Sequence, residues 1–327
     1  MLKRGMEAIA ALLSARADVS LGSTDEISPL QVYPGYHTED LELVARAVCA
    51  TASLEADYYI DGFGVKTLYS CVPFASQDSL DVSRLQFPIP DDGFHAEGIE
   101  YTSLLDAIER FAGNGRFVAV EAGAGWGPWL AMAGVVCKGM GVDTIRLVGA
   151  EASEGRFALM QDHLDFNGLG SDSGVQVNLF RGAVWSYDGK IHFPDSEIED
   201  MGAAASSRAS PTDYRGRSVV SIETPCLRLD TLLGKGSEVD FLHMDVQGAE
   251  MELVSSHKVW LDTSVKSIFI ATHSRPLEGE LMDLLGGSGW RLSREKPCRF
   301  EPGAIRSPWT SATIADGSQY WLNGKFT

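Results

Sequence analysis

Cysteine is scarce in this sequence, and acidic residues outnumber basic ones. The five cysteines form no C-x-x-C pair, which argues against a zinc site and fits a reducing, cytoplasmic environment. Lysine and arginine number 27 against 45 aspartate and glutamate residues, and the net charge is −18. Because the chain lacks a basic excess, we expect no binding of nucleic acid. No apolar run approaches the roughly 18 residues that a membrane-spanning helix needs, so we expect no membrane span.

The first 93 residues show no regular alternation of strand and helix patterns. Their apolar spacing predicts helices over 6–13 and 41–52 and strands over 58–60 and 65–72. A segment rich in proline, aspartate and glycine then interrupts the pattern at 88–93. We therefore expect an N-terminal α+β extension over residues 1–93, packed on a main domain over residues 94–327.

The main domain alternates between the two patterns. Apolar runs predict strands over 117–120, 144–150, 175–179, 239–244 and 267–272, and helices over 101–111, from 128, over 154–167 and over 278–285. Polar residues 186–218 read as a hairpin with a mobile loop, and Ile314, Tyr320 and Trp321 read as a closing antiparallel pair. This alternation predicts an α/β fold, a doubly wound and mostly parallel sheet with an antiparallel closing strand. Ligands of such sheets bind outside the carboxyl ends of the strands.

A strand, an acid and three alternate glycines occur together near residue 120. The apolar run 117–120 is followed by Glu121, and glycines then stand at 123, 125 and 127. Glycine lets the backbone turn tightly and approach a ligand closely. Pro128 suits the first turn of a helix. The stretch is thus the strand–loop–helix corner at which α/β sheets bind nucleotides.

The details of this loop favour one cofactor. The dinucleotide pattern G-x-G-x-x-G would place its last glycine at Pro128, and the Gly-Lys-Ser/Thr of a P-loop is absent. The order Glu-x-Gly-x-Gly-x-Gly resembles the first motif of class I S-adenosylmethionine (SAM) methyltransferases. Glu151 ends the second strand and could accept hydrogen bonds from ribose hydroxyls. Dinucleotide folds carry a similar acid about 20 residues after the loop, so its spacing leaves both cofactors open.

The most specific stretch is Val239–Glu250. An apolar strand followed by Asp245-Val-Gln-Gly-Ala-Glu250 resembles the signature of FkbM-type methyltransferases, and 227–233 matches the family's lead-in. Residues 268–273 resemble its fifth strand, with Ala271 where the family usually has an acid. The resemblance covers residues 94–325. It implies a Rossmann-like class I fold, dependence on SAM, and O-methylation of a hydroxyl on a sugar, glycan or secondary metabolite. It leaves residues 1–93 unexplained, and we interpret them as a candidate cap for the acceptor.

The resemblance and the strand-end positions together define an expected site. We expect His273 to act as the base and Asp245 to orient the acceptor, with His243 as the alternative base. Glu250 suits a helix cap as well as a catalytic role. The expected cofactor contacts lie in the glycine loop, at the following strand ends and in the segment before the first core helix; they are Glu97, Glu121, Gly123, Ala124, Gly125, Trp126, Gly127, Glu151, Ala152, Gly182, Ala183 and Asp245.

A divalent metal is not favoured by the sequence. Catechol-type enzymes hold their ion with a strand-end Asp and a later Asp-Asn pair, and residues 271–275 contain no such pair. No metal ligand is therefore predicted. Two other functions stay open: a nicotinamide-dependent oxidoreductase on a related sheet, and a non-catalytic module that binds SAM. The expected partner is a small-molecule or carbohydrate acceptor, and the chain could form a homo-oligomer.

Overall fold

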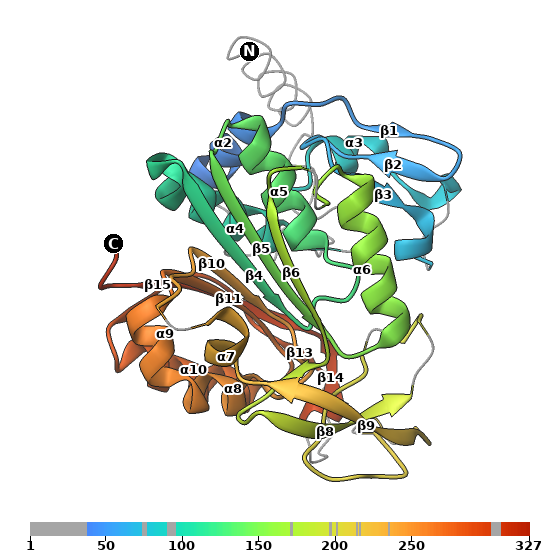
Figure 1. The fold of residues 1–327 in the computed structure, drawn as a ribbon, viewed down its shortest axis with the longest axis vertical. Helices are drawn as coiled ribbons and strands as arrows, with labels where there is room; N and C mark the ends of the chain where they lie inside the picture. The colour runs from blue at the N-terminus through green and yellow to red at the C-terminus, as the bar shows by residue number, and fades with distance from the viewer. Residues whose placement is uncertain are drawn as a thin grey trace, which may run out of the picture. The chain divides into compact units, whose positions relative to one another are not determined.

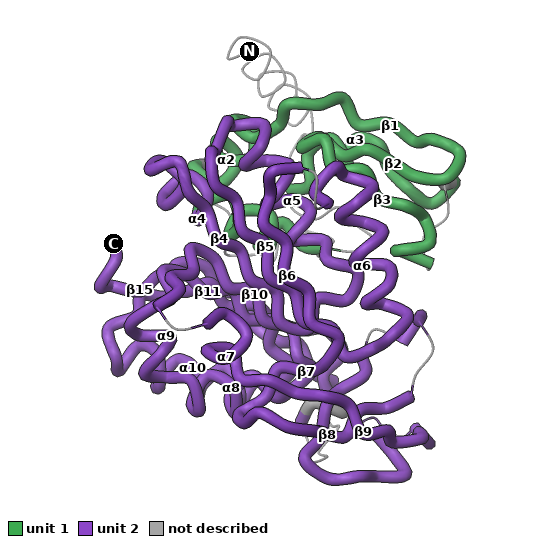
Figure 2. The backbone as a smooth tube through the Cα atoms, in the orientation of Figure 1, with its two compact units in different colours: residues 1–106 green, residues 107–327 purple. Residues whose placement is uncertain are grey.

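The chain divides into two compact units, residues 1–106 and 107–327 (Figure 2). The structure is a computed structural model that describes residues 38–73, 77–89, 96–170, 173–195, 198–200, 202–213, 215, 217–234, 236–301 and 309–327. The predicted helix at 6–13 and the predicted boundary at 93/94 lie outside the described residues. Helix α4 (Gly98–Phe111) runs across the division between the units.

The first unit contains a small antiparallel sheet. Strands β1 (Ser53–Leu54), β2 (Tyr58–Ile60) and β3 (Lys66–Leu68) pair in that order, and helices α2 (Thr38–Ala47) and α3 (Val82–Gln86) belong to the same unit. Two predicted bounds are wrong. Helix α2 ends before residue 52 because the N–H groups of Cys49 and Ala50 donate to the Gly62 carbonyl. The strand predicted to reach 72 stops at Leu68, where a 3₁₀ turn begins.

The second unit is built on a seven-stranded sheet with the order β12-β15-β11-β10-β4-β5-β6. Neighbouring strands from β11 to β6 run parallel, whereas β15 runs antiparallel to both β11 and β12. The bounds are β4 Arg116–Ala122, β5 Thr144–Glu151, β6 Gln176–Arg181, β10 Phe241–Met244, β11 Ser267–Thr272, β12 Trp290–Lys296 and β15 Gly317–Asn323. The predicted fold class is confirmed: a mostly parallel, class I methyltransferase-like sheet with an antiparallel end.

The predicted closing pair is only half right. Tyr320 and Trp321 lie in β15, as expected, but the partner of β15 at the sheet edge is β12, which the sequence did not indicate. Ile314 belongs instead to β14 (Thr313–Ala315), which pairs with β13 (Arg299–Phe300) in a separate ribbon. The strand β12 was missed because its polar residues, from Arg291 to Lys296, give it no apolar run.

Helices cover both faces of this sheet (Figure 1). Helices α5 (Pro128–Gly139) and α6 (Glu154–Phe166) lie on one side, and α8 (Glu250–Ser256), α9 (Lys258–Ser264) and α10 (Arg275–Gly286) lie on the other. Every residue of β10 is buried. Burial on both faces explains why the central strands are continuous apolar runs without polar alternation.

A second, smaller sheet follows β6 along the chain. Strands β7 (Ala183–Val184), β9 (Val220–Leu227) and β8 (Gly189–Asp195) pair in that order, and the short helix α7 (Leu229–Leu233) comes next. The hairpin predicted within 186–218 is partly right: β8 does pair antiparallel, but its partner β9 lies beyond 218. Arg215 ties the intervening segment together, because its guanidinium binds both carboxylate oxygens of Asp200.

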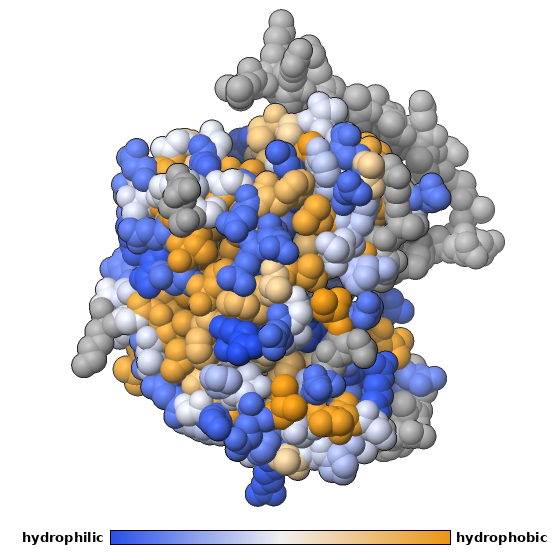
Figure 3. Space-filling view, turned by 45° about the vertical axis from the view of Figure 1, so that its right-hand side comes forward, coloured by the Kyte–Doolittle hydropathy of each residue, from blue (hydrophilic) through white to orange (hydrophobic). Residues whose placement is uncertain are grey.

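Hydrophilic side chains interrupt the hydrophobic ones over the face shown in Figure 3. Among the described residues, no helix is long and apolar enough to cross a membrane. The expectation of no membrane-spanning helix is thus confirmed for that part of the chain.

Candidate functional site

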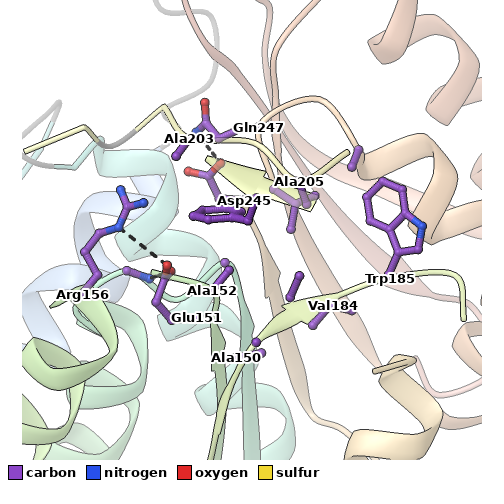
Figure 4. A pocket seen from close by; sticks show the side chains of 17 residues that line it. Ala150, Glu151, Ala152, Arg156, Val184, Trp185, Ala203, Ala205, Asp245 and Gln247 are labelled. Atoms are coloured by element: carbon purple, nitrogen blue, oxygen red, sulfur yellow. Dashed lines mark hydrogen bonds and ion pairs between the residues drawn. The ribbon is translucent and has the colours of Figure 1, made fainter. Parts of the chain in front are cut away.

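A pocket opens at the carboxyl ends of β4, β5 and β10 (Figure 4). This is the edge at which doubly wound sheets bind their ligands. The glycine loop, the end of β5, the start of the smaller sheet and the turn after β10 all contribute to its wall. The lining residues are Gly123, Gly125, Ala150, Glu151, Ala152, Arg156, Gly182, Ala183, Val184, Trp185, Phe193, Ala203, Ala205, Asp245, Val246, Gln247 and Ala249.

Close packing of backbone requires glycine in the loop after β4. Gly123 has a φ of +74°, and a Cβ there would lie 1.8 Å from the carbonyl oxygen of Asp245. Gly127 has a φ of +70°, and a Cβ there would lie 2.8 Å from Cγ of Met160. Both positions therefore exclude other residues on two grounds, backbone conformation and lack of space. The loop brings the end of β4 against the turn after β10.

Glu151, the last residue of the neighbouring strand β5, holds the glycine loop by a hydrogen bond. Its Oε2 accepts a hydrogen bond from the Gly125 N–H at 2.8 Å, and its Oε1 accepts from the Ser153 N–H at 2.7 Å. Oε1 also lies 3.6 Å from Nε of the buried Arg156 (Figure 4). Burial raises the pKa of Glu151, although Arg156 and the backbone donors act in the opposite direction. A carboxylate held in this way can still accept hydrogen bonds from a ligand's hydroxyl groups.

Several predicted cofactor residues lie together at this pocket. Gly123, Gly125, Glu151, Ala152, Gly182, Ala183 and Asp245 all line it. Gly182 is packed so closely that a Cβ would lie 2.5 Å from both Phe180 and the Pro225 carbonyl oxygen. Whether each of these residues contacts a cofactor stays a prediction.

Other predicted residues lie nearby but do not line the pocket. Oε2 of the buried Glu121 accepts a hydrogen bond from the Leu130 N–H at 3.1 Å, so this carboxylate caps helix α5. Trp126 is buried against His163, with ring centroids 4.9 Å apart. Ala124 and Gly127 complete the turn, which a hydrogen bond from the Gly127 N–H to the Ala124 carbonyl closes.

Glu97 belongs to the first unit. Its N–H donates to Oε2 of Glu100 at 2.8 Å, an arrangement that caps the start of α4. Its expected contact with the cofactor stays a prediction.

Asp245 stands in the pocket wall at the end of β10. Its side chain is 36% exposed, and Nε2 of Gln247 donates to its Oδ1 at 2.9 Å (Figure 4). Gln247 has a φ of +57°, a strained conformation for a residue other than glycine. Burial alone would raise the pKa of Asp245, but the neighbouring His273 outweighs burial and lowers it. Asp245 is therefore an ionised group that a ligand in the pocket can reach.

His273 lies behind Asp245, between two carboxylates. Its Nε2 is 3.4 Å from Oδ1 of Asp245, and its Nδ1 is 3.0 Å from Oε1 of the fully buried Glu250. Burial alone would lower the pKa of His273, yet the two carboxylates raise it well above the ordinary value. With no other cation beside it, the ring therefore favours its protonated form, which cannot accept a further proton. The expected role of His273 as the base is therefore not supported by this arrangement.

Glu250 does not cap helix α8, whose first turn has no side-chain cap; its carboxylate instead has two other contacts. Its Oε1 accepts from the N–H groups of Val246 and Gly248 at 3.2 and 3.1 Å, which fixes the turn after β10. The same oxygen faces His273. Nothing in the spacing of Glu250 and His273 indicated this contact, because the two residues come from different elements. Among the described residues, Asp245, Glu250 and His273 are the group whose ligand-type atoms lie close enough, within 4.8 Å, to share a metal ion.

His243 does not reach the pocket. It is buried, stacked on Phe269 with ring centroids 4.9 Å apart and planes 6° from parallel, and Trp129 lies 5.5 Å away. Burial lowers the pKa of His243 to about 4, with a small opposing effect from Asp245. It is therefore a neutral ring in the core, and the alternative of His243 as the base is not supported.

The sequence did not predict several other residues of the pocket wall, and four of them have large side chains. Arg156, Trp185, Phe193 and Gln247 all line the pocket. Arg156 lies in the first turn of α6, and Phe193 lies in β8. Each reaches the pocket through tertiary packing, for which no local pattern exists.

Comparison with known proteins bears on the identity of this fold and pocket. Residues 115–292 match the model of the methyltransferase FkbM domain. A protein of Jannaschia sp. (strain CCS1) named "Putative methyltransferase" is 32% identical over 234 residues, which make up 67% of this chain and 77% of the relative.

Two solved structures also align with part of this chain. The methyltransferase FkbM of Methylobacillus flagellatus KT aligns with a TM-score of 0.38 and 12% identity, over 68% of this chain and 54% of that one. The C-terminal domain of precorrin-6Y C5,15-methyltransferase from Rhodobacter capsulatus aligns with a TM-score of 0.37 and 13% identity, over 71% and 91%. The extent of the family match and the identity to the Jannaschia relative establish that this chain belongs to the FkbM methyltransferase family.

Proposed function

We propose that this methyltransferase binds SAM in the pocket at the carboxyl edge of the sheet and transfers its methyl group to a hydroxyl. One observation carries the proposal: Asp245, an ionised and partly exposed acid, shares a pocket with the glycine loop and Glu151. The loop and Glu151 suit a nucleoside, and Asp245 adds an acid beside it for an acceptor.

The pocket wall suggests how SAM would lie. Glu151 would accept hydrogen bonds from the ribose hydroxyls, since its oxygens retain acceptor capacity beyond the Gly125 and Ser153 N–H groups. The methionine part would lie over Gly123 and Gly125, and the adenine beside Gly182 and Ala183. Arg156 offsets the cost of burying Glu151.

The reaction would be an in-line displacement at the sulfonium methyl group. The acceptor oxygen forms a bond to the methyl carbon as the carbon–sulfur bond breaks, which gives a methyl ether, S-adenosylhomocysteine (SAH) and a proton. Because the cofactor supplies a strong electrophile, the protein mainly orients the two reactants. Asp245 would position the hydroxyl.

A wide neighbouring groove supports a hydroxylated acceptor of some size. A second pocket of about 1,030 Å³ shares Trp185, Phe193, Ala205, Gln247 and Ala249 with the first. Its wall combines aromatic side chains such as Tyr187 with hydroxyl and charged groups such as Ser210 and Arg208. Aromatic faces beside hydrogen-bonding groups suit the apolar and polar sides of a sugar ring, so we infer a sugar, glycan or other polyhydroxylated acceptor.

The test combines cofactor binding with identification of the product. In calorimetry, SAM and SAH should bind and NAD(P) should not; the reverse would favour an oxidoreductase. The full chain is then incubated with methyl-deuterated SAM and cell extract, with Asp245→Asn as the comparison. A labelled methyl ether that forms only with the wild type is expected. A labelled N- or C-methyl product would contradict O-methylation, and SAM binding without any labelled product would favour a binding module.

A further inference from the structure

With a neutral imidazole, the contact between Asp245, His273 and Glu250 contains three acceptors and only one donor. A neutral imidazole has one N–H and one lone pair. If Nδ1 carries the hydrogen, it faces Oε1 of Glu250 at 3.0 Å, and the lone pair of Nε2 then faces Oδ1 of Asp245 at 3.4 Å. The Nε2 lone pair and the Asp245 oxygen can each only accept a hydrogen bond, so they would face each other unpaired in a buried environment. A second proton on the ring, or a metal ion between Nε2 and Oδ1, would remove this opposition.

The geometry at Nε2 is poor for a hydrogen bond. A separation of 3.4 Å exceeds the usual N–H···O range of about 2.7–3.2 Å. Within the described part of the chain, neither ring nitrogen of His273 has a hydrogen-bond partner of acceptable geometry, although its side chain is only 5% exposed. Two ligands that each bind one divalent ion at about 2.1 Å lie roughly 3 Å apart when they meet at a right angle. The observed distance is only slightly longer than this.

The surroundings also suit an ion that takes part in a reaction. Asp245 faces the pocket, so further coordination positions would be open to water or to an acceptor hydroxyl. Glu250 would hold the Nδ1 hydrogen, the usual arrangement behind a metal-binding histidine. Its charge and that of Asp245 together balance a divalent ion, and its Oε2 is buried with no hydrogen-bond partner in the described residues. One imidazole with carboxylate oxygen favours Mn²⁺ or a similar ion.

We propose that Asp245 and Nε2 of His273 bind a divalent cation at the pocket wall, with Glu250 orienting the imidazole. The role of the ion rests on the proposed function: an acceptor hydroxyl bound to it becomes more acidic and loses its proton to solvent as the methyl group is transferred. This replaces the base that His273 does not provide. The sequence did not favour a metal because residues 271–275 contain no Asp-Asn pair to join Asp245.

Binding of Mn²⁺ to the EDTA-treated full chain tests the site directly. The loss of the free Mn²⁺ signal in electron paramagnetic resonance gives the affinity without any need for activity. We expect one bound ion in the wild type and no measurable binding in Asp245→Asn, which removes a partly exposed charge and should leave the fold intact. Glu250→Gln keeps an oxygen for the Nδ1 hydrogen and should weaken binding by about 10–100-fold. Glu252→Gln, an exposed position on the same helix, makes the same change in charge and should bind as the wild type does.

The outcomes separate this inference from the proposed function. SAH affinity is measured on the same metal-free samples. No Mn²⁺ binding by the wild type, or equal binding by Asp245→Asn, overturns the metal site, and a proton then links His273 to Asp245. If SAH still binds in that case, the proposed cofactor pocket stands. Mn²⁺ binding that depends on Asp245 supports the site even if SAH does not bind, and the proposed function then fails by itself.

Discussion

The α-carbon of Gly123 lies so close to Asp245 that an added Cβ would be 1.8 Å from the Asp245 carbonyl oxygen. The glycine loop after β4 and the turn after β10 thus pack backbone against backbone. Gly123→Ala should lower the free energy of unfolding by more than about 3 kcal/mol, because a positive φ and a steric clash add together. Urea unfolding and SAH calorimetry would measure the effect.

Gly139→Ala is the matched control for this change. Gly139 ends helix α5, and an added Cβ would have nothing within 4 Å. It should stabilise the protein by up to about 1 kcal/mol, the usual gain from replacing a helical glycine. If Gly123→Ala unfolded at the same urea concentration as Gly139→Ala, the described packing of the two turns would be wrong.

Replacing Glu151 should weaken SAH binding in a graded way. Glu151→Ala removes an acceptor for the ribose hydroxyls and the anchor of the Gly125 N–H, so we expect a loss of about 1.5–3 kcal/mol in binding free energy. Glu151→Gln keeps one acceptor oxygen and should lose less. Calorimetry at pH 7.5 measures both. Unchanged affinity in the two variants would mean that Glu151 only supports the loop.

The affinity for SAH should also fall with pH in the wild type. The ionised form of Glu151 accepts the hydrogen bonds, so ligand binding favours deprotonation. Affinity is then lost as the pH falls through the pKa of the free protein, which burial raises above the ordinary value of 4.5. The loss should therefore begin at a higher pH than for an ordinary glutamate. Calorimetry from pH 8 downward should show it in the wild type, and Glu151→Gln should show a flatter profile; parallel profiles would assign the pH effect to another group.

Removing the positive charge of Arg156 should shift that profile. Arg156 and Glu151 are both buried, and Arg156 lowers the pKa that burial raises. In Arg156→Met the pKa of Glu151 should rise further, so SAH affinity should fall at a higher pH than in the wild type. Loss of one partner of a buried pair should also cost about 3–5 kcal/mol of stability. An unshifted profile in a folded Arg156→Met protein would show that the pair is not coupled.

One thiol should react faster than the other four. Cys49 is exposed, whereas Cys71, Cys137, Cys226 and Cys298 are buried. Burial raises the pKa of Cys137 and of Cys298 to about 12, so these two should form almost no thiolate at pH 8. A chromogenic disulfide reagent should label one cysteine quickly in the native protein and all five in denaturant. Cys49→Ser should remove the fast phase; if it persisted, a buried cysteine would have to be more accessible than described.

The sequence predicted the strands of the sheet better than it predicted the contacts among the site residues. Strands such as β5 and β11 are buried on both faces, so their apolar runs were unambiguous. Strand β12 was missed because its edge position tolerates polar residues. The positions of Glu151 and Asp245 could be predicted because the carboxyl ends of parallel strands lie at the same edge of the sheet. The contacts of His273 did not, because they depend on Glu250 folding back from the turn after β10.

The position of β15 has a consequence for how the chain folds during synthesis. Gly317–Asn323 lies between β11 and β12, two strands that precede it in the sequence and do not pair with each other. Until the ribosome has released this segment, both strands present unpaired backbone edges that favour aggregation. A chain cut after Phe300 would keep those edges permanently. The sheet that supports the pocket can therefore be completed only after β15 has left the ribosome.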